Sequence, residues 1–257
     1  MGDRPILLLG GTGEARALAA ELTTARLPVV SSLAGRVRDP RLPMGEVRIG
    51  GFGGIDGLVD WLRAHDVMAV VDATHPFAAT ISEHAAAAAA TVDLPLLRLR
   101  RPSWTPGPAD TWESVPDMTA AAQAVAAHAA ARGDLRVLLT TGRQDVGVFA
   151  PIEAAWFLIR VVDPPTAELP PRHRILRSRG PYDVEGERTL LQQNGIGLLV
   201  TKNSGGELTR AKLVAAAELG VGVIMVQRPP EPGHGDSVES VSAAIEWIRH
   251  GVTPSES

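Results

Sequence analysis

The sequence of 257 residues contains no cysteine. This absence excludes disulfide bonds, thiolate metal sites and a thiol nucleophile, and it fits a reducing compartment. The seven histidines show no metal-ligand spacing such as H-x-x-x-H. The sequence also lacks a G-x-S-x-G nucleophile elbow and a G-x-x-x-x-G-K-[ST] phosphate loop. We therefore expect no metal site, and hydrolase and kinase functions are disfavoured.

The sequence has little net charge and no long apolar run. Its formal net charge of −4 indicates neither a nucleic-acid partner nor an anionic membrane surface. No window approaches the roughly 18 consecutive apolar residues of a membrane span. The apolar stretch Ile6–Leu9 is far shorter than the core of a secretory signal peptide. We expect a cytoplasmic protein without nucleic-acid or membrane partners, either a monomer or a weak oligomer.

Strand-like and helix-like patterns alternate along the whole chain, which predicts an α/β fold with mainly parallel sheets covered by helices. In the first half, the expected strands are Ile6–Leu9, Val29–Ser32, Val47–Ile49, Ala69–Asp72 and Leu94–Leu99, and the expected helices are Glu14–Arg26, Ile55–His65 and Phe77–Thr91. In the second half, the expected strands are Arg136–Thr140, Trp156–Val161, Ile175–Arg177, Leu198–Thr201 and Val223–Val226, and the expected helices are Met118–Ala131, Val184–Asn194, Leu208–Leu219 and Val238–Arg249.

The alternation breaks between Arg100 and Pro116, where proline, glycine, tryptophan and aspartate replace it. Such a stretch is typical of a domain junction. We therefore expect two α/β domains, residues 1–102 and 103–257. A cleft between them is the expected place for a bound cofactor and substrate.

A glycine-rich turn follows the first expected strand. Its residues are Gly10, Gly11, Thr12, Gly13, Glu14 and Ala15. Glycines let the backbone approach a ligand closely, and the free N–H groups at the start of a helix favour a phosphate. The spacing is not the full G-x-G-x-x-G of dinucleotide-binding proteins, so a strand-to-helix turn without a ligand stays an alternative.

Two further strand ends of the first half suit a cofactor. The segment with Ser31, Ser32 and Arg36 has no carboxylate for a ribose 2′-hydroxyl, and hydroxyls with a guanidinium can hold a 2′-phosphate. This pattern favours NADPH over NADH, with an ordinary surface loop as the alternative.

Thr74 and His75 follow another strand, where side chains face the ligand crevice. His75 could donate a proton, donate a hydrogen bond, or serve only in capping or packing.

Three expected strand ends of the second half carry polar and basic residues. They are Thr140–Asp145, Arg177–Gly180 and Thr201–Glu207, which would place Arg143, Arg177, Arg179 and Lys202 at one edge. Such a concentration of positive charge suits a polycarboxylate or a phosphate, although each loop by itself could be a solvated turn. Lys202 is one of only two lysines in the chain.

These motifs together resemble the precorrin-6A reductases of cobalamin biosynthesis over essentially the whole chain. The resemblance rests on Gly10–Ala15, Asp72–Ala78, Thr141–Arg143, Ser178–Pro181 and Thr201–Gly206, which occur in this order. It implies two Rossmann-like domains with the active site between them. It also implies an NADPH-dependent reduction of one ring double bond of precorrin-6A to give precorrin-6B, with hydride going to a ring carbon (C19) and a proton to its neighbour (C18).

The resemblance also implies roles for the candidate residues. The pyrophosphate of NADPH would lie at Gly10–Gly13, the 2′-phosphate near Ser32 and Arg36, and the nicotinamide toward Thr74 and His75. The residues expected to hold substrate carboxylates or line their site are Arg143, Ser178, Arg179, Thr201, Lys202, Asn203, Ser204 and Gly205. His75, Asp145 and water are unranked candidates for the proton source.

Three other functions stay open from the sequence. The chain could be an NADP-dependent reductase of a smaller cyclic imine, a non-catalytic nucleotide or tetrapyrrole-binding protein, or a tetrapyrrole methyltransferase. The sequence also leaves open whether the substrate contains cobalt and whether strands are exchanged between the two domains.

Overall fold

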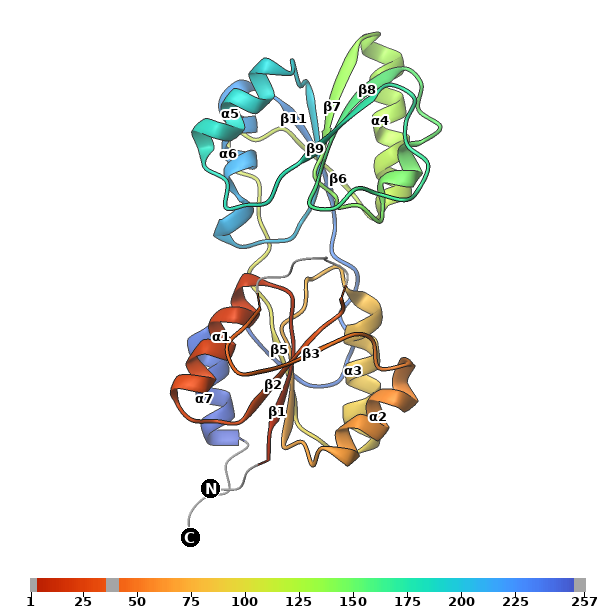
Figure 1. Cartoon of the computed structure of the whole chain (residues 1–257). Helices are drawn as coiled ribbons and strands as arrows, with labels where there is room; N and C mark the ends of the chain where they lie inside the picture. Colours follow the sequence, from red (N-terminus) through yellow and green to blue (C-terminus); the bar gives the residue numbers. More distant parts are fainter. Residues whose placement is uncertain (1–3, 36–41, 252–257) are drawn as a thin grey trace. The chain divides into compact units, whose positions relative to one another are not determined.

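The chain forms two compact units. The computed structural model describes residues 4–35 and 42–251. Met1–Pro102 and Pro229–Ser257 make up unit 1, and Ser103–Arg228 make up unit 2. Each unit contains one six-stranded sheet with helices on both faces (Figure 1).

Unit 1 has the strand order β12-β5-β4-β1-β2-β3, with every pair parallel. This is the Rossmann order 3-2-1-4-5-6, in which the chain changes direction between β1 and β4. Its elements are β1 (Ile6–Leu9), α1 (Gly13–Thr24), β2 (Val29–Leu33), β3 (Glu46–Ile49), α2 (Gly54–Ala64), β4 (Ala69–Asp72), α3 (Ala79–Thr91), β5 (Leu96–Leu99), β12 (Asp236–Val238) and α7 (Val241–Gly251).

The core of unit 1 lies on both faces of this sheet. Helices α1 and α7 cover one face, and α2 and α3 cover the other (Figure 1). The side chains of β1 alternate between the faces: Ile6 and Leu8 pack beneath α1 and α7, whereas Leu7 and Leu9 pack beneath α2 and α3. All four are buried because β1 lies in the centre of a parallel sheet.

Unit 2 repeats the same topology with the order β6-β11-β10-β7-β8-β9, again all parallel. Helices α5 and α6 cover one face, and α4 covers the other (Figure 1). Its elements are β6 (Trp112–Val115), α4 (Met118–Arg132), β7 (Leu135–Leu139), the 3-10 helix η1 (Val146–Phe149), β8 (Ala155–Val161), β9 (His173–Arg177), α5 (Val184–Gln193), β10 (Leu198–Lys202), the 3-10 helix η2 (Glu207–Thr209), α6 (Ala211–Leu219) and β11 (Gly222–Val226).

The expected domain division needs a correction at its C-terminal end. The first break lies at residue 102 as expected, but residues 229–257 belong to unit 1 and not to the second domain. Strand β12 pairs with β5, and Ala244 and Ile248 of α7 are buried in the core of unit 1. The sequence pattern did not reveal this because β12 has three residues, none of them buried.

The two sixth strands are exchanged between the units, which answers a question that the sequence left open. In unit 1, β1–β5 follow one another in the chain and β12 takes the sixth position; in unit 2, β7–β11 follow one another and the preceding strand, β6, takes the sixth position. Strand β6 follows β5 of unit 1 in sequence but completes the sheet of unit 2, and β12 follows β11 of unit 2 but completes the sheet of unit 1. The stretch between Arg100 and Pro116, expected to be a linker, therefore contains a strand.

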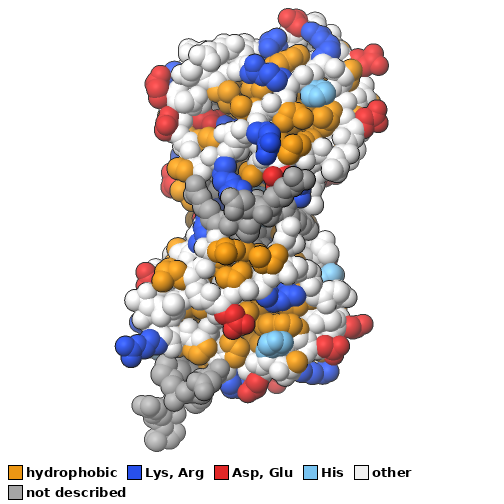
Figure 2. Space-filling view, viewed as in Figure 1, with side chains coloured by type: hydrophobic (Ala, Val, Ile, Leu, Met, Phe, Trp, Pro, Cys, Tyr) orange, Lys and Arg blue, Asp and Glu red, His pale blue; other side chains and the backbone are white. Residues whose placement is uncertain are grey.

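The described residues contain no helix that is long and apolar enough to cross a membrane. Among those same residues, no cluster of histidine and acidic side chains could hold a metal ion. Acidic and basic side chains are both scattered over the face that Figure 2 shows.

Candidate active site

The glycine-rich turn lies at the carboxyl end of β1, next to the point where the chain direction of unit 1 changes. Thr12 is the N-cap of α1: its hydroxyl accepts a hydrogen bond from the Ala15 N–H at 3.1 Å and donates one to the Ala73 carbonyl at 2.8 Å. The Gly10 N–H donates to the Ser32 carbonyl at 3.0 Å. These bonds tie the turn to the ends of β2 and β4.

The turn contains backbone N–H groups that have no hydrogen-bond acceptor among the described residues. Within the described part of the chain, the N–H groups of Gly13 and Glu14 have no hydrogen-bond acceptor. Gly11 has a φ of 118°, which only glycine adopts readily, and a Cβ there would meet no atom of the described residues within 4 Å. The first turn of a helix attracts anions, so this geometry fits a phosphate group.

Glu14 introduces a negative charge into the same turn, and Arg101 compensates it. One guanidinium nitrogen of Arg101 contacts both carboxylate oxygens of Glu14, at 3.0 and 3.1 Å. Both side chains are largely buried, with 13% and 25% exposure respectively. Arg101 therefore removes the repulsion that Glu14 would exert on a phosphate at the turn. Sequence reasoning missed Arg101 because it is 87 residues away from its partner.

The end of β2 carries the expected serines, and a basic residue that the sequence did not single out lies beside them. Arg36 lies outside the described residues, so its contact with a 2′-phosphate stays a prediction. Arg48 of β3 donates a hydrogen bond to the Ser32 hydroxyl at 2.9 Å. Its guanidinium lies over the Phe52 ring, 3.8 Å from the centroid, and burial lowers the pKa of this group from its ordinary value. Ser31 is buried, and its hydroxyl has no hydrogen-bond partner among the described residues.

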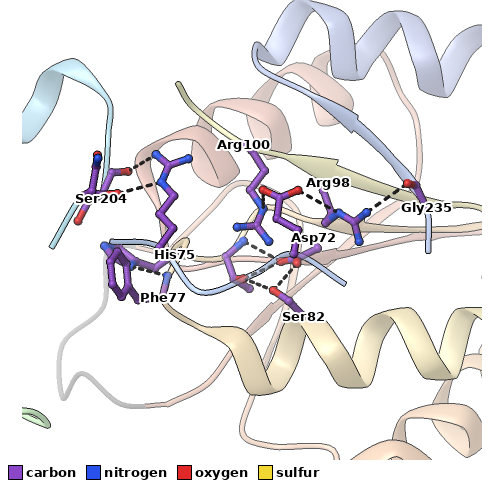
Figure 3. Close-up of polar contacts among 12 residues, drawn as sticks. Asp72, His75, Phe77, Ser82, Arg98, Arg100, Ser204 and Gly235 are labelled. Atoms are coloured by element: carbon purple, nitrogen blue, oxygen red, sulfur yellow. Dashed lines mark hydrogen bonds and ion pairs between the residues drawn. The ribbon is translucent and has the colours of Figure 1, made fainter. Parts of the chain in front are cut away.

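Asp72, the last residue of β4, shapes the loop that carries Thr74. Its carboxylate is 2% exposed and accepts hydrogen bonds from the Thr74 N–H at 3.1 Å, the Thr74 hydroxyl at 2.6 Å and the Ser82 hydroxyl at 2.6 Å (Figure 3). The Thr74 hydroxyl is thus engaged with Asp72. The following helix begins at Ala79, later than the expected start at Phe77.

His75 is exposed in this loop and its orientation is defined. The Phe77 N–H donates a hydrogen bond to His75 Nδ1 at 3.2 Å (Figure 3). Because Nδ1 accepts this bond, the proton of the neutral ring is on Nε2. Nε2–H is therefore the hydrogen-bond donor of the neutral ring.

In unit 2, the equivalent change of chain direction lies between β7 and β10. The segment Thr140–Asp145 follows β7, and Asn203–Gly206 follows Lys202 at the end of β10. Lys202 Nζ contacts Asp145 Oδ2, so the structure brings these two predicted residues together across neighbouring strands. The Thr141 hydroxyl is buried without a partner among the described residues, and a Cβ on Gly142 would meet no atom within 4 Å.

The loop after β10 is held by residues that sequence reasoning did not single out. The side-chain amide of Asn203 bonds both backbone groups of Trp104, accepting from its N–H at 2.9 Å and donating to its carbonyl at 3.1 Å. The indole of Trp104 donates to the Gly206 carbonyl at 3.0 Å. Arg228 donates to the carbonyls of Asn203 and Ser204 at 2.9 and 3.1 Å. Asn203, proposed for the substrate, therefore has its side chain engaged in fixing the loop.

Ser178 and Arg179 share this edge of the sheet but lie apart from the junction of β7 and β10. They follow β9, the edge strand, which β8 separates from β7. The peptide bond between Gly180 and Pro181 is cis. Thr201 is buried at the end of β10, 1% exposed, so its side chain belongs to the sheet interior.

Comparisons with known proteins agree with this architecture. A family model described as precorrin-6x reductase CbiJ/CobK matches residues 5–249. A precorrin-6A reductase of Rhodococcus erythropolis is 53% identical over 246 residues, which cover 95% of this chain and 96% of that protein. A cobalt-precorrin-6A reductase of Salmonella typhimurium is 29% identical over 273 residues, which cover 95% of each chain. A solved structure named CobK precorrin-6A reductase superposes with a TM-score of 0.87 at 40% identity, covering 99% of this chain and 100% of that one.

The match extends through both units and includes every candidate segment that the structure describes. The identity and the coverage both exceed what a shared fold alone would produce. The chain therefore belongs to the precorrin-6x reductase (CbiJ/CobK) family.

Proposed function

We propose that this protein reduces precorrin-6A with NADPH, with unit 1 binding the cofactor and unit 2 holding the substrate. The observation that carries the proposal is the turn of unit 1 at the carboxyl edge of a Rossmann sheet. There, N–H groups without an acceptor among the described residues, a Glu14 paired with Arg101, and an arginine beside Ser32 occur together. This is the edge where Rossmann sheets bind dinucleotides.

The residues present fit a phosphorylated dinucleotide. The N–H groups of Gly13 and Glu14 can donate to a pyrophosphate, and Gly11 leaves room among the described residues for its oxygens. No acidic residue occurs in β2, where an NAD-binding protein would place a carboxylate for the 2′-hydroxyl. Ser32 with an arginine instead suits a 2′-phosphate, which favours NADPH.

Unit 2 supplies cations for a substrate with several carboxylates. Lys202 is held by Asp145 at the end of β10, and Arg143 follows β7 at the neighbouring strand end. Arg179 and Ser204 add donors at the same edge of the sheet. Ammonium and guanidinium groups bind carboxylates strongly when they are fixed in place, and fixed carboxylates orient the ring that carries them.

The structure favours binding roles for both residues that the sequence suggested as proton donors. Asp145 accepts the contact from Lys202, an arrangement that positions the lysine. His75 accepts at Nδ1 from the Phe77 N–H, which fixes its ring at the carboxyl end of β4, and we assign it a positioning role there. NADPH, when bound, supplies a hydride. We assign the proton that completes the reduction to water.

The relatives favour a substrate without cobalt. The protein from Rhodococcus erythropolis, named precorrin-6A reductase, is 53% identical to this chain, whereas the protein from Salmonella typhimurium, named cobalt-precorrin-6A reductase, is 29% identical. We therefore propose precorrin-6A as the preferred substrate.

Anaerobic assays with purified protein test the proposal. We expect NADPH absorbance at 340 nm to fall stoichiometrically with precorrin-6A, the product mass to rise by two hydrogens, and cobalt-precorrin-6A to react more slowly. Oxidation of NADPH by small cyclic imines but not by precorrin-6A would support the smaller-substrate reductase instead. Binding of both ligands without turnover would support a non-catalytic binding protein, and thermal stabilisation by S-adenosylmethionine would support a methyltransferase.

A further inference from the structure

A buried ion pair lies near the carboxyl end of β8 in unit 2. Arg160, the second-to-last residue of β8, donates a hydrogen bond through Nη1 to Glu187 Oε1 of α5. Their side chains are 6% and 2% exposed, and no other ion pair among the described residues has both side chains so fully buried. The pair therefore belongs to the interior of unit 2, between its sheet and α5.

The stability of the fold does not account for these two charges. Taking both groups out of water carries a desolvation cost, which their attraction offsets only when the remaining donors and acceptors are also satisfied. Glu187 Oε2 is buried and has no hydrogen-bond partner among the described residues. Apolar side chains of similar volume at the same two positions would pack without that cost. The other contact that Arg160 makes therefore indicates what the pair does.

That contact is with Tyr182, the only tyrosine of the chain. The Arg160 guanidinium carbon lies 4.1 Å from the centroid of the Tyr182 ring, a cation–π contact that strengthens as water is excluded. The ring is also close to the backbone of Gly180, where an added Cβ would come within 3.2 Å of two ring carbons. Gly180 has no positive φ, so the neighbouring ring accounts for the glycine. Arg160 and Gly180 together therefore hold the ring in a defined position.

Tyr182 ends a short loop, residues 178–182, that connects β9 to the N-cap of α5. At the start of the loop, the Ser178 N–H donates to the Val161 carbonyl at 3.0 Å. After its end, Asp183 caps α5 by accepting a hydrogen bond from the Gly186 N–H at 2.7 Å. The loop is therefore attached to unit 2 at both ends, and the contact of Tyr182 with β8 fixes the segment between them.

The same loop contains Arg179, an exposed residue that we propose as one of the donors to substrate carboxylates. We propose that the Arg160–Glu187 pair is a positioning device for the reaction: it fixes the Tyr182 ring, and through it the backbone that carries Arg179. The proposal rests on the proposed function, because it assigns a support to that substrate site. A guanidinium on a fixed backbone binds a carboxylate more strongly, because less conformational freedom is lost on binding.

A double replacement separates this role from stability. Arg160→Met combined with Glu187→Leu removes both charges and keeps similar volumes, so thermal unfolding should occur at or above the temperature of the unmodified protein. In steady-state assays we expect the KM for precorrin-6A to rise about 10-fold, with kcat and the affinity for NADPH changed by less than about 2-fold. Tyr182→Ala should reproduce the rise in KM. The conservative Tyr182→Phe should reverse it, because phenylalanine restores the ring.

Arg188→Gln is the matched control, because Arg188 lies on the same helix, α5, and pairs with Glu218 at the surface. It should leave both KM and kcat unchanged. A second measurement needs no substrate: with fluorotyrosine incorporated, the single tyrosine gives one fluorine NMR signal. The double replacement should shift this signal, whereas Arg188→Gln should leave it in place.

An unchanged KM in the double replacement or in Tyr182→Ala would overturn the proposal, as would equal losses of affinity for precorrin-6A and NADPH, which indicate a general effect on the fold. A fluorine signal that does not move in the double replacement would overturn the contact between Arg160 and Tyr182. If the double replacement does not fold, the two Tyr182 variants carry the same test. Failure of the unmodified protein to reduce precorrin-6A would instead overturn the proposed function, and the fluorine signal would still test the contact.

Discussion

Thr12→Val removes one hydroxyl from the glycine-rich turn while keeping the shape of the side chain. That hydroxyl is 9% exposed as part of Thr12 and makes two hydrogen bonds, one from Ala15 and one to Ala73. Loss of an N-cap costs about 1 kcal/mol. A buried carbonyl left without its donor, here that of Ala73, costs about 1 kcal/mol more. We therefore expect the free energy of unfolding to fall by about 2 kcal/mol, which lowers the melting temperature by about 4–8 °C in a chain of this size.

Two measurements check this expectation. Thermal and urea unfolding followed by circular dichroism give the loss of stability, and native-state hydrogen exchange reports on the Ala15 amide, which Thr12 protects directly. Thr12→Ser is the matched control, because serine keeps both hydrogen bonds and should stay within about 0.5 kcal/mol of the unmodified protein. If valine and serine are equally stable, or if the Ala15 amide exchanges at the same rate in both, the hydroxyl does not join β1, α1 and β4 as described.

Three further changes test the candidate site. Arg101→Ala leaves Glu14 unpaired beside the N–H groups of the turn. We expect it to lower the affinity for NADPH, measured by calorimetry, by about 5- to 10-fold. Adding Glu14→Gln should restore most of the affinity, and no restoration would contradict the compensating role of Arg101. Asp145→Asn releases Lys202 and should raise the KM for precorrin-6A by about 5- to 10-fold with little change in kcat. A fall in kcat alone, in steady-state assays, would instead indicate proton donation by Asp145. Arg36→Ala should lower the affinity for NADPH far more than the affinity for NADH. Equal losses of affinity would refute a phosphate contact for Arg36.

Local patterns in the sequence determined the fold class and most elements. Strands β1 and β4 occur within the expected bounds because short apolar runs, Ile6–Leu9 and Ala69–Val71, are typical of strands that are buried on both faces of a parallel sheet. The turn at Gly10–Gly13 was predictable because positive φ and helix capping depend on neighbouring residues only. The basic strand ends of unit 2 followed from the α/β alternation, since parallel strands place their carboxyl ends at one edge.

Contacts between distant residues were beyond the reach of these patterns. The strand exchange depends on pairing between Asp236–Val238 and Leu97–Leu99, and neither β6 nor β12 is long or apolar enough to be recognised alone. The sequence did not reveal that the Asn203 side chain bonds Trp104, because the two residues are 99 positions apart.

The arginine beside Ser32 illustrates most clearly the difference between what local sequence patterns predict and what the tertiary structure decides. From the sequence alone, the nearest basic residue along the chain, Arg36, was the natural candidate. The pairing of β2 with β3 decides that Arg48, 16 residues from Ser32, contacts its hydroxyl. Composition and periodicity determined which strands exist and at which edge the polar residues gather, because both depend on local geometry. Only the tertiary structure decided which side chains meet there, because register and strand order bring together residues that are distant in sequence.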